Sequence, residues 1–106
     1  NDSRMREIMQ YILANLDHEI SLNDLADIVS LNASYLSALF KKETGMTYTE
    51  YVMFCRLEKA KELLADTGKS IAEIADAVGY HDTRHFSKLF TRNIGLKPSE
   101  YRKLYS

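Results

Sequence analysis

The 106-residue sequence contains a single cysteine, Cys55. One thiol can form neither an internal disulfide nor a cysteine-based zinc site, so neither device can stabilise this chain. We expect Cys55 to be a buried, inert side chain. The sequence also lacks a glycine-rich phosphate-binding loop, and no histidine lies near Cys55 along the chain. We therefore expect no enzyme activity and no cofactor.

Long apolar runs are absent as well. No stretch approaches the roughly 18–20 apolar residues that cross a bilayer, and no basic start followed by an apolar segment suggests a signal peptide. The hydrophobic fraction of 45% and the charged fraction of 27% are typical of a globular protein with a packed core. The sequence therefore predicts a cytoplasmic protein without a membrane segment.

The charge of the chain is small in total but unevenly distributed. A net charge of -1 argues mildly against a nucleic-acid partner, since phosphate-binding surfaces are usually basic. However, residues 1–30 carry two basic and six acidic side chains, whereas residues 83–106 carry six basic side chains and one acid. The C-terminal segment therefore has the charge expected of a phosphate-binding surface.

The second half of the chain repeats the first. At a shift of 49 positions, Leu22–Val29 aligns with Ile71–Val78, and after one inserted residue the alignment continues at a shift of 50. The second stretch pairs Ser37 with Ser87, Leu39-Phe40 with Leu89-Phe90, Gly45 with Gly95, and Glu50-Tyr51 with Glu100-Tyr101. Two copies are too few for a solenoid. The repeat therefore predicts a pseudo-symmetric pair of units.

Each unit contains the signals for two short helices joined by a tight turn. Ser21 and Ser70 each precede an acid by three residues, which is the capping-box pattern and predicts helices that begin near residues 22 and 71. These helices are predicted to end after Val29 and Val78, where Ser30 and Gly79 open a tight turn. Asn32 and Asp82 are then placed to cap a second helix, which is predicted to end at Gly45 in the first unit and at Gly95 in the second. Each unit is therefore predicted to be a helix-turn-helix.

A longer helix is predicted between the two units. Thr47 and Glu50 form a third capping box, followed by a helical run through Asp66. At 1.5 Å per residue this run would be roughly 30 Å long, close to the spacing of about 34 Å between successive major grooves on one face of DNA. With a first helix over about Ser3–Leu16 and a last one after Lys97-Pro98, the prediction is an all-α fold of seven helices. Its parts are 1–46, the connecting helix 47–66, and 67–106.

Several motifs resemble those of the AraC/XylS family of bacterial transcription regulators, across essentially the whole chain. They are Ile74-Ala-Asp-Ala-Val-Gly-Tyr80, Phe86-Ser-Lys-Leu-Phe90, Gly95-Leu-Lys-Pro-Ser-Glu-Tyr-Arg102, and Arg56 with Ala60-Lys-Glu-Leu-Leu64. The resemblance implies two homeodomain-like helix-turn-helix units that bind double-stranded DNA and regulate transcription. It also implies a separate sensor or receiver domain, as in two-component response regulators. Lys97 departs from the family pattern, in which a capping serine is common.

The second helix of each unit is the predicted recognition helix. Its apolar stripe is Leu36, Leu39 and Phe40 in the first unit and Phe86, Leu89 and Phe90 in the second. By alignment with the family, base contacts fall on Ser34, Ser37, Ala38, Thr83, Arg84, Ser87 and Lys88. The DNA backbone is expected to be contacted at Asn32, Tyr35, Lys41, Lys42, Asp82, His85 and Arg92. Tyr35 and His85 could instead pack against the turn, and each lysine could be a solvated surface charge.

Two other interpretations account for parts of the sequence. His81 and His85 have the i, i+4 spacing of zinc hydrolases, but Asp82 is better explained as a helix cap and no third ligand is evident, so no metal site is expected. The amphipathic helices would also suit a protein-interaction module. Transcription activators contact RNA polymerase through exposed helix faces, and the acidic first helix is a candidate for such a contact.

Overall fold

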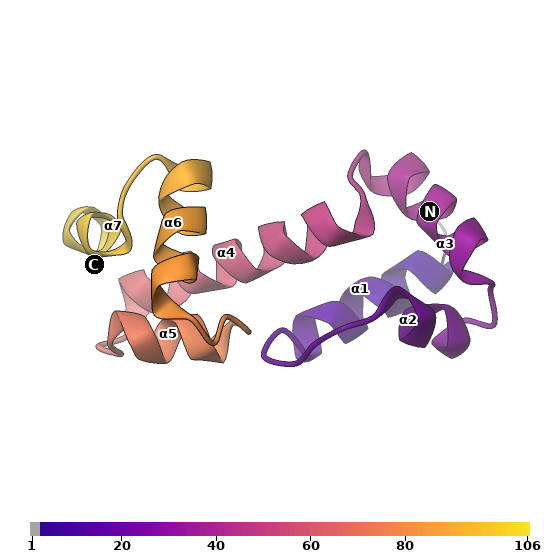
Figure 1. Ribbon diagram of the computed structural model, residues 1–106, viewed down its shortest axis with the longest axis horizontal. Helices are drawn as coiled ribbons and strands as arrows, with labels where there is room; N and C mark the ends of the chain where they lie inside the picture. Colours follow the sequence, from indigo (N-terminus) through magenta and orange to yellow (C-terminus); the bar gives the residue numbers. More distant parts are fainter. Residues whose placement is uncertain (1–2) are drawn as a thin grey trace. The chain divides into compact units, whose positions relative to one another are not determined.

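The computed structural model describes residues 3–106, and within this range it contains seven α-helices and no strand (Figure 1). The helices are α1 (Ser3–Ala14), α2 (Leu22–Ile28), α3 (Ala33–Thr44), α4 (Tyr48–Asp66), α5 (Ile71–Ala77), α6 (Thr83–Ile94) and α7 (Pro98–Tyr105). The predicted all-α class and the number of helices are confirmed. No helix among these residues combines the length and apolar character needed to span a bilayer.

The helices group into two compact units. The first ends at Cys55 and the second runs from Arg56 to Ser106, so the division falls within α4. Each unit contains one helix-turn-helix, formed by α2 and α3 in the first and by α5 and α6 in the second. The repeat found in the sequence therefore corresponds to a repeated structure.

The starts of the helices follow the predicted caps. The Ser21 hydroxyl accepts a hydrogen bond from the Asp24 amide, and Ser70 and Glu73 form the full reciprocal capping box. Thr47 and Glu50 form the same reciprocal pair at the start of α4. These bonds satisfy amides that have no partner within the helix.

The ends of α3 and α6 are set by glycine. Gly45 and Gly95 have φ angles of 74° and 88°, and each donates its amide hydrogen to the carbonyl four residues earlier. These left-handed conformations suit glycine, which has no Cβ.

The first helix is shorter than predicted. The sequence predicts a helix that reaches about Leu16, but α1 ends at Ala14 because Asn15 leaves the helical pattern. The Asn15 amide donates to the Ile12 carbonyl, and its side-chain Nδ2 donates to the Tyr11 carbonyl. Asparagine competes with helices in this way. Leu16 is nevertheless buried in the core.

Each unit has its own apolar core. The first is formed by Met5, Ile8 and Ile12 of α1 with Leu16, Leu25, Leu36, Phe40 and Cys55, and Cys55 is buried as expected. The second contains Leu57, Ala60, Leu64, Ile74, Ala75, Val78, Phe86 and Phe90. The prediction of inward-facing stripes on α3 and α6 is confirmed, although Leu39 and Leu89 are only partly buried.

An aromatic pair recurs in the two cores. The rings of Phe40 and Tyr51 lie 5.3 Å apart, and those of Phe90 and Tyr101 lie 5.7 Å apart, both edge to face. Such pairs contribute about 0.5–1.5 kcal/mol beyond the burial of their area. Burial raises the pKa of Tyr51 to about 12, and the nearby Cys55 contributes further. The Tyr51 phenol therefore remains neutral at physiological pH.

Candidate nucleic-acid interface

The second helix of each unit is fixed at its start by a side chain. Asn32 Oδ1 accepts from the Tyr35 amide at 2.8 Å. Asp82 Oδ1 accepts from the amides of Arg84 and His85 at 3.0 and 3.2 Å. Both capping oxygens are therefore occupied within the protein. The predicted contact of Asn32 or Asp82 with the DNA backbone would therefore have to use main-chain NH groups of the protein.

The predicted base-contacting residues lie on the solvent side of their helices. Ser34, Ser37 and Ala38 of α3 are exposed, as are Arg84 and Lys88 of α6, whereas Thr83 and Ser87 are partly exposed. The buried aromatic residues of α6, Phe86 and Phe90, fix this orientation, because they hold the opposite side of the helix in the core. Each helix therefore presents one polar face.

The two exposed faces differ in chemistry. On α6, Arg84 and Lys88 are one helical turn apart and both are exposed. On α3 the corresponding face has Ser34, Ser37 and Ala38, and its lysines, Lys41 and Lys42, occupy the last turn. Cations at that position also stabilise a helix through its dipole. The α6 face is therefore richer in groups that donate to guanine O6 and N7.

The side chains predicted to contact the DNA backbone differ in their surroundings. Tyr35 is 50% exposed, while His85 packs edge-on against Tyr80, with ring centroids 5.9 Å apart. Tyr80 lies at the turn and also has the Arg56 guanidinium over its ring at 5.4 Å. Burial raises the pKa of Tyr80, and Arg56 partly opposes this. His85 is thus exposed and also contacts an aromatic ring at the turn.

The two histidines considered for a metal site have separate neighbours. His81 Nδ1 lies 2.9 Å from Asp76 Oδ1, and both side chains are highly exposed. His85 instead contacts the Tyr80 ring. The two histidines therefore take part in different local contacts.

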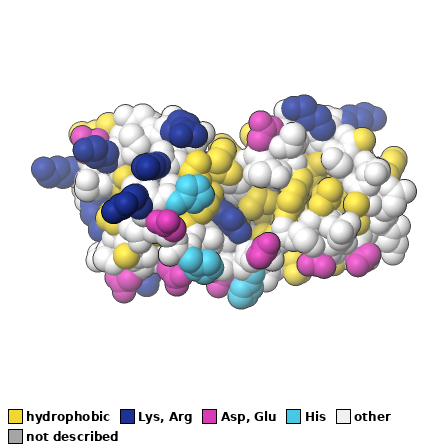
Figure 2. Space-filling model, in the orientation of Figure 1, with side chains coloured by type: hydrophobic (Ala, Val, Ile, Leu, Met, Phe, Trp, Pro, Cys, Tyr) yellow, Lys and Arg dark blue, Asp and Glu magenta, His cyan; other side chains and the backbone are white. Residues whose placement is uncertain are grey.

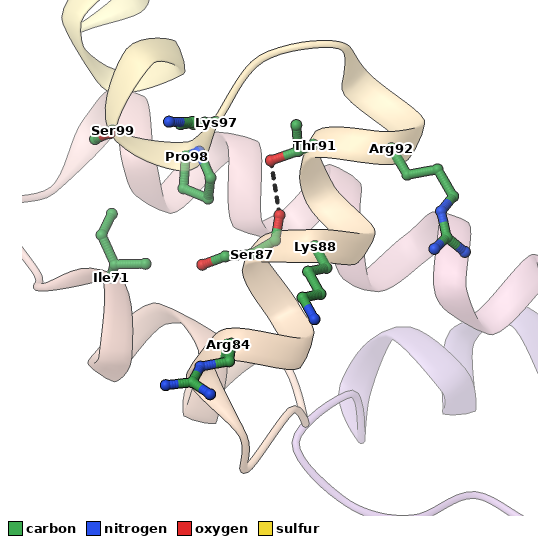
Figure 3. A pocket seen from close by; sticks show the side chains of 9 residues that line it. All are labelled: Ile71, Arg84, Ser87, Lys88, Thr91, Arg92, Lys97, Pro98 and Ser99. Atoms are coloured by element: carbon green, nitrogen blue, oxygen red, sulfur yellow. Dashed lines mark hydrogen bonds between the residues drawn. The ribbon is translucent and has the colours of Figure 1, made fainter.

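An open cavity of about 580 Å³ lies beside the exposed face of α6. Its lining combines predicted DNA-contacting residues with others that the sequence interpretation missed: Ile71, Arg84, Ser87, Lys88, Thr91, Arg92, Lys97, Pro98 and Ser99. Figure 3 shows Ser87 on the side of α6 toward Ile71 and Pro98, with Arg92 extending away from them. The Thr91 hydroxyl donates to the Ser87 carbonyl at 2.7 Å. The start of α7 thus borders the α6 face.

The two units also differ in net charge. Residues 1–55 carry four basic and eight acidic side chains, and residues 56–106 carry ten basic and seven acidic ones. Figure 2 shows Lys and Arg side chains gathered over the unit that contains α6 and α7. The small net charge of the chain therefore conceals a basic second unit.

Comparisons with known proteins agree with this arrangement. The family model described as a helix-turn-helix domain matches residues 25–104. The melibiose operon regulatory protein of Escherichia coli K12 is 34% identical over 92% of the chain. That match covers 32% of the relative, so the chain spans about a third of its length.

Two crystal structures are similar throughout. A transcriptional regulator with an AraC-type DNA-binding domain from Chromobacterium violaceum has a TM-score of 0.93 at 30% identity, covering 98% of this chain and 93% of that one. The C-terminal domain of a two-component response regulator from Fusobacterium nucleatum has a TM-score of 0.87 at 31% identity, covering 95% and 99%. With the matched motifs, the paired helix-turn-helix units and these relatives, the chain belongs to the AraC/XylS family of helix-turn-helix regulators.

Proposed function

We propose that this chain binds double-stranded DNA in a sequence-specific manner and regulates transcription, with α3 and α6 in successive major-groove segments. The observation that carries the proposal is the exposed face of α6. There, Arg84 and Lys88 project from a helix whose opposite side, through Phe86 and Phe90, is fully buried. A rigid helix with a polar, basic face suits the major groove, which admits an α-helix.

Base readout is assigned to residues on both helices. Arg84 and Lys88 donate to guanine, Ser34, Ser37, Thr83 and Ser87 offer hydroxyls, and Ala38 offers a methyl group suited to thymine. Because a good bidentate contact contributes roughly 1–3 kcal/mol of discrimination, α6 carries more of the sequence preference than α3. Lys41, Lys42 and Arg92 bind phosphates, with smaller contributions at Asn32, Tyr35, Asp82 and His85.

The whole chain acts as one DNA-binding domain with parts 1–46, 47–66 and 67–106, in the bacterial cytoplasm, attached to a sensor or receiver domain. The similarity to a response regulator's C-terminal domain supports that attachment. The sequence interpretation offers an acidic first helix as a candidate for an RNA polymerase contact. However, α1 carries Arg4 and Arg6 against Glu7, so the acidic surface lies instead at Asp17, Glu19, Asp24 and Asp27.

The proposal is tested by selection from a pool of randomised duplexes. The purified chain should enrich a site with two sequence blocks about one helical turn apart. Fluorescence anisotropy of the best binder should then show affinity falling steeply as salt rises, because several phosphate contacts release counterions. Absence of binding at low salt would refute DNA binding and favour the protein-interaction alternative. Binding without an enriched site would refute sequence specificity.

A further inference from the structure

The cavity beside α6 contains a basic side chain in addition to those predicted to contact DNA. Among the nine described residues that line it, four are cationic and none is acidic. Arg84, Lys88 and Arg92 come from α6, and the fourth cation, Lys97, precedes α7. Three hydroxyl side chains, Ser87, Thr91 and Ser99, complete its polar lining. Such a lining attracts an anion that accepts several hydrogen bonds.

A comparison of the two repeats shows that Lys97 is an unusual choice. The equivalent position in the first repeat is Thr47, whose hydroxyl accepts from the Glu50 amide at 3.1 Å. Lys97 has no side-chain acceptor for this bond, although its own amide donates to Glu100 Oε1 at 2.8 Å. The absence of this cap makes the start of α7 less stable than a capped start would be. Residues whose type disagrees with the preference of their local structure occur mainly at functional sites.

We propose that Lys97, with Ser99, binds a phosphodiester group of the DNA backbone in this cavity. The inference rests on the proposed function and adds the start of α7 to the DNA-binding surface. The Lys97 ammonium supplies a point charge, which is a common phosphate ligand, and the Ser99 hydroxyl supplies a donor. Both side chains are exposed.

The positions of Lys97 and Ser99 distinguish their role from base readout. Lys97 and Ser99 lie at the start of α7, beyond the end of α6, whereas Arg84 and Lys88 lie in its first two turns. The lining also includes two apolar residues, Ile71 and Pro98, and Pro98 is buried. A mixed basic and apolar surface suits the sugar-phosphate backbone, whose deoxyribose is largely hydrocarbon. Contacts there position the protein without reading sequence.

The test is Lys97→Thr, with Lys103→Thr as its matched control. The first substitution restores the residue that caps α4 in the other repeat, so the start of α7 should remain folded. The second removes the same charge from an exposed position on α7 outside the cavity. The Lys97→Thr variant should bind about five- to tenfold more weakly at 0.1 M salt. The slope of log Kd against log salt should fall by about 0.9, equally on the selected duplex and a scrambled one. The Lys103→Thr control should match the wild type in both.

A second measurement identifies the contacted group. Single neutral methylphosphonates are placed in turn along the selected duplex. One position should weaken the wild type clearly more than the Lys97→Thr variant, in which only the Ser99 hydroxyl still contacts that phosphate. If every position acts equally on both proteins, or if the two variants share the wild-type salt slope, the inference is overturned while the proposed function stands. If the wild type and the control both fail to bind any duplex, the proposed function fails as well.

Discussion

The guanidinium of Arg102 on α7 connects to the end of α4. Its Nε donates to the Leu64 carbonyl at 3.1 Å and its terminal nitrogen donates to the Thr67 carbonyl at 3.2 Å. The last carbonyls of a helix have no partner within it, so Arg102 satisfies two groups that would otherwise need water. This contact holds α7, and with it Lys97 and Ser99, in place within the second unit.

Replacement of Arg102 by alanine should therefore destabilise the second unit. Hydrogen bonds from a charged donor contribute about 1.5–3 kcal/mol, and Arg102→Ala should lower the free energy of unfolding by that amount. Urea denaturation followed by circular dichroism measures the loss. Lys103→Ala, on the exposed side of the same helix, is the control and should have little effect. Equal losses in the two variants would contradict the capping role of Arg102.

The turns of the two repeats offer a matched pair of substitutions. Ser30 has a φ angle of 57° and its counterpart Gly79 has one of 94°. Since residues with a Cβ are strained in this region, Ser30→Gly should stabilise the first unit by about 0.5–1 kcal/mol. Gly79→Ser should destabilise the second by a similar amount, measured by the same denaturation. A loss of stability in Ser30→Gly would show that the serine side chain has a role that outweighs the strain.

The capping box of α5 predicts an acid-sensitive component of stability. Hydrogen bonds from the Ser70 backbone, and then from its side chain, hold the pKa of Glu73 below its ordinary value of 4.5. A carboxylate with a lowered folded-state pKa stabilises the protein above 4.5, and this contribution is lost as pH falls through the folded-state value. Thermal melting between pH 3 and 6, about the range of this titration, should show a smaller pH dependence for Glu73→Gln. An unchanged pH profile would contradict this contribution.

Sequence reasoning was most successful where a structure is decided by neighbours along the chain. The caps at Ser21, Ser70 and Thr47 and the glycine stops at Gly45 and Gly95 were predicted because each acts within one helical turn. The end of α1 was missed by two residues. The hydrogen bond from Asn15 to Tyr11 competes with a pattern of apolar residues that continues to Leu16.

Long-range contacts were not predictable from spacing. Arg102 bonds to a carbonyl 38 residues away, and nothing local to either residue indicates that pairing. The cavity likewise brings Ile71 of α5 and Lys97 before α7 beside α6. The one available signal was the lysine at a position suited to a capping hydroxyl. That signal indicates only that the residue at the start of the helix cannot accept the capping hydrogen bond. The structure is needed to show that Lys97 and the exposed face of α6 line one cavity.

Arg84→Ala tests most directly whether α6 reads base sequence. Affinities of the wild type and the variant are measured on the selected duplex and on its single-base-pair substitutions, at constant salt. We predict that Arg84→Ala removes roughly 1–3 kcal/mol of preference at one base pair and leaves the preferences elsewhere unchanged. Arg92→Ala, the comparison for a phosphate contact, should weaken all duplexes alike. If Arg84→Ala also weakened every duplex by the same factor, Arg84 would not contact a base edge, and the assignment of sequence readout to α6 would be wrong.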